Sequence, residues 1–189
     1  NALLSRIFEG YQPLLDDAGA QDLIAHQGKL HVYERADGLA RSAYALEMRR
    51  RRGVEIKEMS GDEAREMEPL LSPIIKGAAF FPDVHTVLNP LRLVQVFAEH
   101  FVRSGGTLLR ESVSGFEIGA DGPSRIITDA GSHEVDKVVI ATGAWSIPLA
   151  KQMGLNPPLE AERGYHTMIT DPGIDISVSI TSNERYVVL

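Results

Sequence analysis

Apolar residues recur at helical spacing in three stretches of the chain. This spacing predicts helices over residues 3–15, 39–52 and 90–104. Asn89 directly precedes the last of these helices, where an N-cap residue is expected. Ser60 and Glu63 have the spacing of a capping box and predict a shorter helix over residues 60–68.

Segments rich in β-branched or alternating apolar residues lie between and after these helices. They predict strands over residues 28–33, 74–81, 107–111, 113–118, 124–128, 137–140, 165–169, 177–180 and 186–189. Residues 82–89 are rich in turn formers and predict a loop. Strands and helices in this order indicate an α+β (α/β) fold, a mixed sheet with flanking helices.

The most informative strand end is the sequence VVIATGAWS, residues 138–146. It begins with β-branched residues that are apolar on both faces, which is typical of a strand buried in a parallel sheet. The small residues that follow permit a ligand to approach the backbone, and Gly143 permits a turn that a side chain would block. We expect a helix to start next, with Ser146 as its N-cap and Pro148 in its first turn. A tight strand-to-helix turn that binds nothing is an equally good explanation of this segment alone.

Composition narrows the function. The 189 residues carry a formal net charge of -7, which argues against a nucleic-acid-binding protein because such proteins need a basic surface. The absence of cysteine excludes disulfides, thiolate metal sites and a cysteine nucleophile. The 6 histidines show no metal-ligand spacing, and no hydrolase elbow or phosphate-binding loop is present, so we expect no metal site. We expect a cytoplasmic protein, and leave open an association of the parent protein with the inner face of the membrane.

The order of several motifs resembles a known family. A helix ending in Ser-Gly-Gly is followed by the strand TLLRE, Val113, a hairpin at Asp121 and Gly122, the VVIATGAWS junction and the segment ERGYH. This order is similar to that of FAD-dependent amine oxidoreductases of the D-amino acid oxidase superfamily. The chain most resembles the D-amino acid dehydrogenase branch, with glycine and sarcosine oxidases as relatives. The resemblance runs from about residue 28 to the last residue and is strongest over 89–166.

The resemblance implies positions for the cofactor. Val113 matches a strand residue whose backbone contacts the adenine of FAD, and a core strand position is the alternative. Ala141, Thr142, Gly143 and Ala144 match the segment near the FAD phosphates and ribityl chain. These residues are therefore the first cofactor-binding candidates.

Further candidates lie on either side of this segment. Trp145 matches a tryptophan beside the cofactor, and an anchor that packs the following helix onto the sheet is the alternative. Arg163 and Gly164 match the segment that leaves the cofactor domain close to the flavin. Arg163 has the fork geometry that suits a carboxylate, and a surface ion pair with a nearby glutamate is the alternative.

The same resemblance implies residues on the substrate side. Tyr165 is expected to line the substrate site, and His85, Thr86 and Asn89 lie on the loop that runs near the flavin at the domain boundary. For His85, a loop histidine without a chemical role is the alternative. The catalytic residue remains unknown, since these enzymes need no base beyond deprotonation of the amine.

The chain departs from the family pattern at two places. It has no G-x-G-x-x-G turn after a strand, and it stops inside a predicted strand, before the arginine that binds the substrate carboxylate in the oxidases. We therefore expect a piece of a longer protein. Residues 1–104 are assigned to the substrate side, 105–158 to an inner segment of the FAD-binding domain, and 159–189 to strands returning to the substrate domain. We expect no tightly bound FAD in this piece and a homodimer through open sheet edges.

For the parent protein, the resemblance implies oxidation of the CH-NH2 group of a D-amino acid by hydride transfer to FAD, with oxygen or a quinone as the electron acceptor. The piece alone is expected to be inactive. Alternatives within the family are a glycine- or sarcosine-type oxidase, or a flavin dehydrogenase acting on a small hydroxy acid or glycerol 3-phosphate. An alternative of a different class is a non-catalytic α/β module that binds a small acid or a partner protein.

Overall fold

The computed structural model describes residues 6–120, 122–165, 167, 169–171, 173–182, 184 and 187–188. The chain forms two compact units. Unit 1 comprises the described residues of 1–106 and 171–189, and unit 2 comprises those of 107–170. The cofactor and substrate roles that the sequence suggests for 1–104, 105–158 and 159–189 stay predictions.

Unit 1 is built on a mixed sheet with the strand order β10-β9-β2-β4-β3. Its strands are β2 (Lys29–Tyr33), β3 (Lys57–Ser60), β4 (Gly77–Phe81), β9 (Ser179–Ser182) and β10 (Val187–Val188). β4 pairs antiparallel with β2 and β3, whereas β9 runs parallel to β2. The mixed sheet with flanking helices confirms the predicted fold class.

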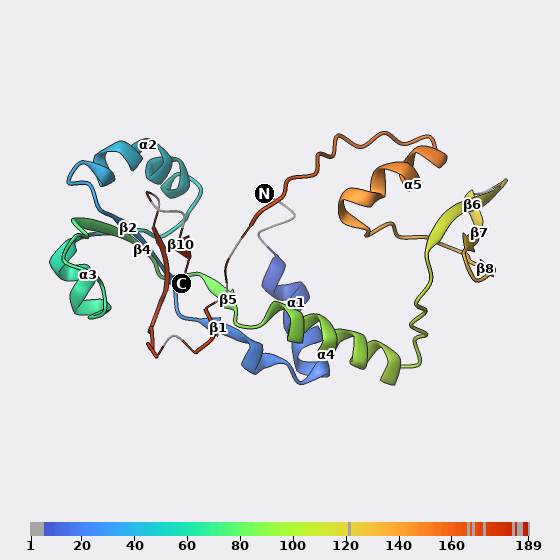
Figure 1. Ribbon diagram of the computed structural model, residues 1–189, viewed down its shortest axis with the longest axis horizontal. Helices are drawn as coiled ribbons and strands as arrows, with labels where there is room; N and C mark the ends of the chain where they lie inside the picture. Colours follow the sequence, from blue (N-terminus) through green and yellow to red (C-terminus); the bar gives the residue numbers. More distant parts are fainter. Residues whose placement is uncertain are drawn as a thin grey trace. The chain divides into compact units, whose positions relative to one another are not determined.

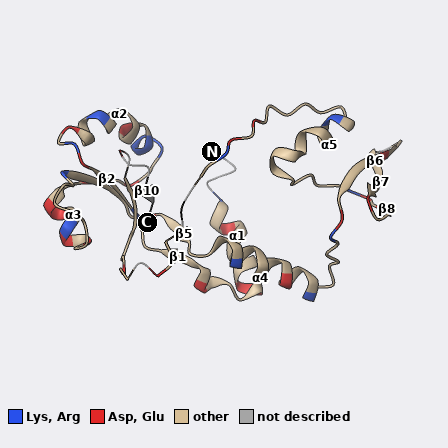
Figure 2. Cartoon of the chain, in the orientation of Figure 1, with Lys and Arg blue, Asp and Glu red and all other residues tan. Residues whose placement is uncertain are grey.

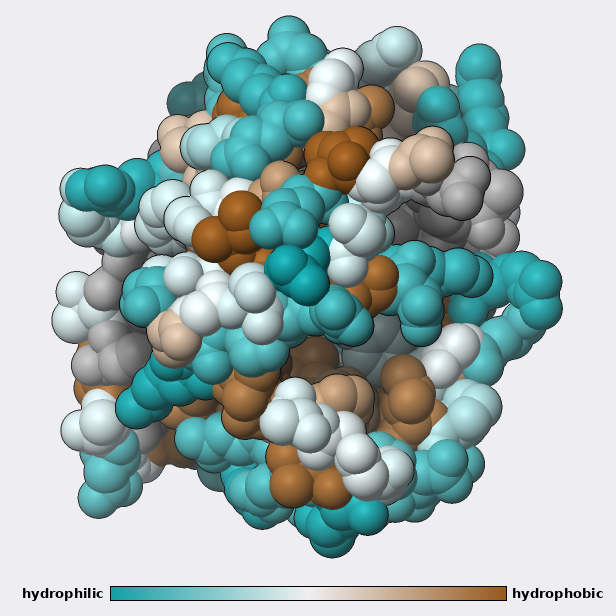
Figure 3. All heavy atoms as spheres, turned by 90° about the vertical axis from the view of Figure 1, so that its right-hand side faces the viewer, coloured by the Kyte–Doolittle hydropathy of each residue, from teal (hydrophilic) through white to brown (hydrophobic). Residues whose placement is uncertain are grey.

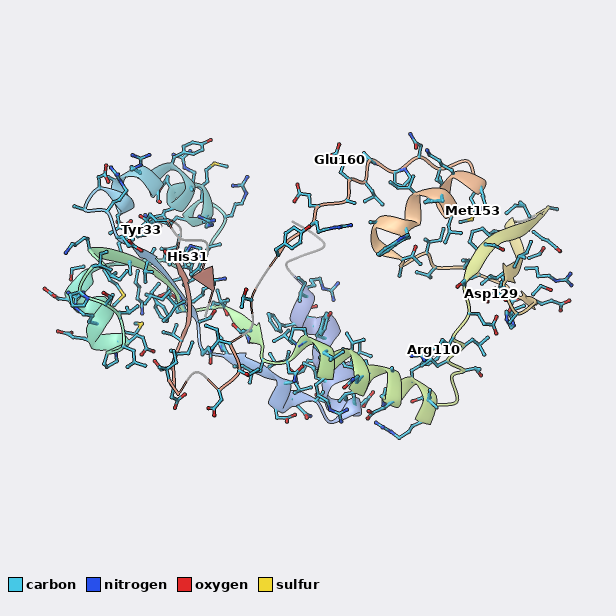
Figure 4. All side chains as sticks on the ribbon, in the orientation of Figure 1. His31, Tyr33, Arg110, Asp129, Met153 and Glu160 are labelled. Carbon is cyan, nitrogen blue, oxygen red and sulfur yellow. The ribbon has the colours of Figure 1, made fainter. Side chains whose placement is uncertain are left out.

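Two helices cover opposite faces of this sheet (Figure 1). On one face, α3 (Gly61–Met67) packs through Ala64 against Leu30 and Val32 of β2. On the other, α2 (Gly38–Arg50) packs through Leu46 against Tyr33. His31 and Tyr33, which Figure 4 labels, are two positions apart on β2 and therefore share the α2 face.

The end of α2 is basic, as the coloured ribbon of Figure 2 shows. Arg49 and Arg50 lie in its last turn, where positive charge complements the helix dipole. A guanidinium nitrogen of Arg50 donates to Glu58 at 2.6 Å, which ties this helix end to β3.

The remaining elements of unit 1 are two helices and a short ladder with a hydrophobic cluster of their own. The helices α1 (Ile7–Ala18) and α4 (Pro90–Arg103) pack through Leu15, Leu93 and Val96. The strands β1 (Ile24–His26) and β5 (His85–Val87) pair antiparallel, and the 3-10 turn η1 (Gln21–Leu23) precedes β1. The prediction of a loop over 82–89 is therefore wrong at β5, because this three-residue strand is stabilised by β1, which the sequence pattern did not reveal.

Unit 2 contains a three-stranded antiparallel meander and one short helix. Its elements are β6 (Val113–Gly119), β7 (Gly122–Thr128), β8 (Ser132–Glu134), the 3-10 turn η2 (Gly143–Trp145) and α5 (Ser146–Gln152). The hairpin expected at Asp121 and Gly122 joins β6 to β7, although Asp121 itself lies outside the described residues.

Three predicted strands of unit 2 are wrong. Residues 107–111 and 137–140 are not strands, and neither are the described residues of 165–169. Their apolar composition favours an extended chain, but a strand also needs a hydrogen-bonded neighbour, and no described strand pairs with them. Val139, expected inside a buried strand, is 88% exposed.

Within the described residues, no helix combines the length and apolarity needed to cross a membrane.

Candidate functional site

The VVIATGAWS junction lies in unit 2 and leads into α5. Gly143 has a φ of 55°, in the left-handed region that glycine favours, and opens the η2 turn. Among the described residues, nothing beyond its chain neighbours lies within 4 Å of the place that a Cβ would take there. The five cofactor candidates Ala141, Thr142, Gly143, Ala144 and Trp145 are all exposed.

The predicted N-cap of α5 is wrong by one position. Ser146 is the first residue of the helix and Trp145 occupies the cap position, because the η2 turn carries the chain directly into α5. The Ser146 hydroxyl lies 3.1 Å from the Thr142 hydroxyl, so it bonds backward to the junction instead of capping backbone amides.

Val113, the adenine candidate, begins β6 and is 40% exposed, so the alternative of a core position is not what the structure shows. Its neighbour Ser114 accepts a hydrogen bond through its carbonyl from the Gln152 side chain of α5, at 3.1 Å. A Cβ at Gly115 would lie 2.6 Å from the side-chain oxygen of the same Gln152, so a side chain there would displace the end of Gln152. The start of β6 and the end of α5 are therefore held together within unit 2.

Arg163, Gly164 and Tyr165 lie on a segment of unit 2 outside helices and strands. Within the part of the chain that the structure describes, Arg163 forms no ion pair with Glu160 or Glu162. Tyr165 is 86% exposed. The Arg163 guanidinium and the Tyr165 phenol are thus open to solvent, and their predicted contacts with cofactor or substrate stay predictions. Figure 3 shows apolar side chains among polar ones on the face that it draws.

His85 and Asn89, the other substrate-side candidates, lie in unit 1. The His85 ring stacks on His26, with centroids 4.0 Å apart, and contacts Phe8 at 3.8 Å. Burial lowers the pKa of His85, and the adjacent His26 lowers it further, while Asp83 partly opposes this. The neutral imidazole is therefore favoured.

A largely apolar groove of about 460 Å³ adjoins this histidine. Its walls come from α1, β1 and the chain around β5, including Phe8, Tyr11, Ile24 and Thr86. Asn89 has a local role in the structure: its side-chain oxygen accepts from the Arg92 amide at 3.0 Å and caps α4. The predicted N-cap is thus confirmed.

One polar cluster in unit 2 has no counterpart in the sequence prediction. A single carboxylate oxygen of Glu111 accepts from the Thr128 hydroxyl at 2.6 Å and lies 2.7 Å from Nε2 of His133. The bond from Thr128, and then that from His133, holds the pKa of Glu111 below its ordinary value. Glu111 is distant in sequence from Thr128 and His133, and the three residues form no motif, so only the folded β7-β8 hairpin with Glu111 beside it reveals the cluster. Arg110 and Asp129, labelled in Figure 4, lie next to it along the chain.

Comparison with known proteins identifies the family. The family model described as FAD dependent oxidoreductase (DAO) matches residues 2–188. The chain belongs to this family of FAD-dependent oxidoreductases.

Individual relatives agree with this assignment. The chain is 29% identical to a D-amino-acid oxidase of Bradyrhizobium diazoefficiens over 95% of its length and 42% of that protein. It is 27% identical to a D-amino acid dehydrogenase of Dechloromonas aromatica, over 94% of the chain and 45% of that protein. The crystal structure of glycine oxidase from Bacillus cereus superposes with a TM-score of 0.68 at 28% identity, covering 77% of the chain and 40% of the oxidase. The chain thus spans less than half the length of each of these three proteins.

Proposed function

We propose that the chain is part of an FAD-dependent oxidoreductase that oxidises the CH-NH2 group of a D-amino acid, or of a similar small amine, to an imino acid. The observation that carries this proposal is the family match over residues 2–188, joined to the similarity with a D-amino-acid oxidase over 95% of the chain. FAD, when bound, supplies the acceptor for the hydride that leaves the substrate carbon.

The residues of unit 2 fit a cofactor that lies against the backbone. The segment 141–145 is exposed and consists mainly of small residues. Gly143 leaves open space where a side chain would stand, so a phosphate or ribityl group can approach its backbone. Val113 is also exposed, at the start of a strand that Gln152 ties to α5. These features support a role for both segments in holding FAD.

Other residues have separate roles in this proposal. Trp145, whose ring is exposed, would lie beside the cofactor and would cover apolar surface there and exclude water. Arg163 and Gly164 would lie on the segment close to the flavin, and the exposed guanidinium of Arg163 would bind a carboxylate. Tyr165, His85 and Asn89 lie on the substrate side.

Two narrower substrate assignments compete with D-amino acids. The similarity to the Bacillus cereus glycine oxidase supports glycine as the amine, and sarcosine is a related alternative. A small hydroxy acid or glycerol 3-phosphate is the second alternative substrate, and the similarity to an anaerobic glycerol-3-phosphate dehydrogenase subunit supports the latter. A non-catalytic binding module is the remaining alternative.

A visible absorbance spectrum of the full-length natural protein tests the proposal. We expect flavin absorbance that bleaches under anaerobic conditions when D-alanine or another D-amino acid is added. Bleaching by glycine and sarcosine alone would move the assignment to a glycine-type oxidase, and bleaching only by glycerol 3-phosphate would exclude amines. A protein purified without flavin that also fails to bind added FAD would contradict the proposal.

A pair of glycine variants tests the cofactor segment. Gly143 and Gly154 both have positive φ, at 55° and 74°, and both have open space where the methyl group of an alanine would stand. Alanine therefore adds similar backbone strain at either position. We expect Gly143→Ala to weaken FAD binding by about tenfold, or about 1.4 kcal/mol, and Gly154→Ala to leave it unchanged. Fluorescence titration of the apoprotein with FAD measures the difference, and equal effects would remove Gly143 from the site.

A further inference from the structure

The β1-β5 ladder places two histidines opposite each other. His26 and His85 are register partners, so their side chains project from the same face of the ladder. Their rings lie with centroids 4.0 Å apart. The residues come from different parts of the chain, which is why histidine spacing in the sequence gives no sign of the pair.

A carboxylate completes the group. Asp83 lies two residues before His85, and its Oδ1 is 3.4 Å from Nε2 of His26. One ligand atom from each of His26, Asp83 and His85 lies within 4.8 Å of the other two. The Asp83 side chain is 85% exposed and that of His26 54%, so an ion can reach them from solvent.

His85 also carries an unsatisfied polar atom. Its Nδ1 is buried and, among the described residues, has no hydrogen-bond partner. A buried nitrogen of this kind costs free energy unless something binds it. The groove that includes Asp83 and His85 in its walls offers space for a ligand beside the group.

We propose that His26, Asp83 and His85 form a binding site for a divalent transition-metal ion such as Zn²⁺. Two imidazole nitrogens and one carboxylate oxygen are a ligand set that Zn²⁺, Co²⁺ and Ni²⁺ accept. Three protein ligands leave a further coordination position for water or for an anion in the groove. The site consists of unit 1 residues only and shares His85 with the proposed substrate side, but metal binding itself does not depend on flavin chemistry.

Binding requires one ring to turn. The two rings are nearly parallel, with 6° between their planes, and an imidazole nitrogen binds a metal within the plane of its own ring. Rotation about the last side-chain torsion of histidine has broad minima and costs little. His26 is the ring that turns, because it is half exposed, whereas His85 is held against Phe8. The bound ion then joins β1 to β5 and protects the ladder.

Titration calorimetry with Zn²⁺ and the visible spectrum with Co²⁺ test the site. The full-length protein is used, free of any histidine tag and stripped of metal by a chelator. We expect calorimetry to give one Zn²⁺ ion per chain. We expect the Co²⁺ complex to show the visible ligand-field bands of a metal with few ligands, bound through nitrogen and oxygen. Asp83→Asn and His26→Ala are each expected to weaken Zn²⁺ binding by at least about tenfold, the lower end of what even an outer-shell partner contributes.

Two controls keep the result interpretable. His100→Ala, on α4, removes a histidine away from the cluster and is expected to leave the affinity unchanged. Asp83→Asn alters an exposed side chain without changing its size, so loss of binding in this variant is not a folding defect. Zn²⁺ is also expected to slow hydrogen exchange of the Leu88 amide, which donates to Leu23 beside the ladder. Absence of stoichiometric binding, or equal affinity in Asp83→Asn and wild type, would overturn the proposal.

Discussion

Glu111 links two strands of unit 2 through one oxygen atom. Its carboxylate accepts from Thr128 at the end of β7 and contacts His133 on β8. Since these contacts lower its pKa in the folded state, the stabilisation is present at neutral pH, above the ordinary pKa of a glutamate. It is lost as pH falls through the lowered pKa of the folded state.

Glu111→Gln is therefore expected to speed amide hydrogen exchange in the β7-β8 ladder at neutral pH. The difference from wild type should disappear in acid, where the wild-type carboxyl is also protonated. Hydrogen exchange read by mass spectrometry at both pH values measures this. Glu160→Gln, an exposed glutamate in the same unit, is the matched control. A difference that persists unchanged in acid would show that the charge of Glu111 is not responsible.

At the level of elements, the side chain of Asn89 caps the N-terminus of α4. Asn89→Ala removes this cap and is expected to lower the free energy of unfolding by about 1 kcal/mol, whereas Asn89→Ser should retain most of it because a serine hydroxyl also caps. Urea unfolding measures both variants.

The Asn89→Ala and Asn89→Ser variants also distinguish the capping role of Asn89 from its predicted role on the substrate side. If Asn89 only caps α4, the serine variant keeps both stability and activity. If its amide also contacts substrate, kcat/KM falls in the serine variant while stability does not. Equal stability of the alanine variant and wild type would contradict the capping role.

The helices were predictable from sequence because their signals are local, whereas several strands were not, because a strand needs a pairing partner. Asn89 before α4 and the capping box of Ser60 and Glu63 are local signals, and both were confirmed. The segment 137–140 has strong strand propensity, yet it is not a strand, because pairing depends on a neighbour distant in sequence. β1 and β5 show the converse, since each is a weak pattern stabilised by the other.

For the candidate sites too, local features were predictable from the sequence, and contacts between distant segments were not. The exposed turn at Gly143 was predictable, because glycine and its neighbours determine the turn locally. The Glu111 cluster and the His26, Asp83 and His85 group were not, since each is assembled by strand pairing. The sequence thus indicates sites made from one segment and misses those made from several.

At the level of the whole molecule, the chain leaves unit 1 after residue 106 and returns to it at 171. Glu68 binds the returning segment: its carboxylate, in a residue 2% exposed, accepts from the Ser177 amide at 2.8 Å and the Ser177 hydroxyl at 3.0 Å. Val178 and Ile180 then enter the core beside β2. One buried carboxylate therefore helps to close a unit made from two separate parts of the chain.

Glu68→Gln is expected to cost about 1 kcal/mol, because both Ser177 donors bind one carboxylate oxygen, and the neutral amide oxygen that replaces it is a weaker acceptor than a charged one. The loss should be local at first: amides of β9 exchange faster, whereas those of the β2-β4 ladder keep most of their protection, since Val178 and Ile180 still bury apolar surface. Hydrogen exchange resolved by peptide distinguishes the two strands. Glu66→Gln changes an exposed glutamate of α3, two residues before Glu68, and should alter neither. If β9 exchanges at the wild-type rate in Glu68→Gln, its apolar side chains alone hold the returning segment, and the carboxylate is dispensable for closing unit 1.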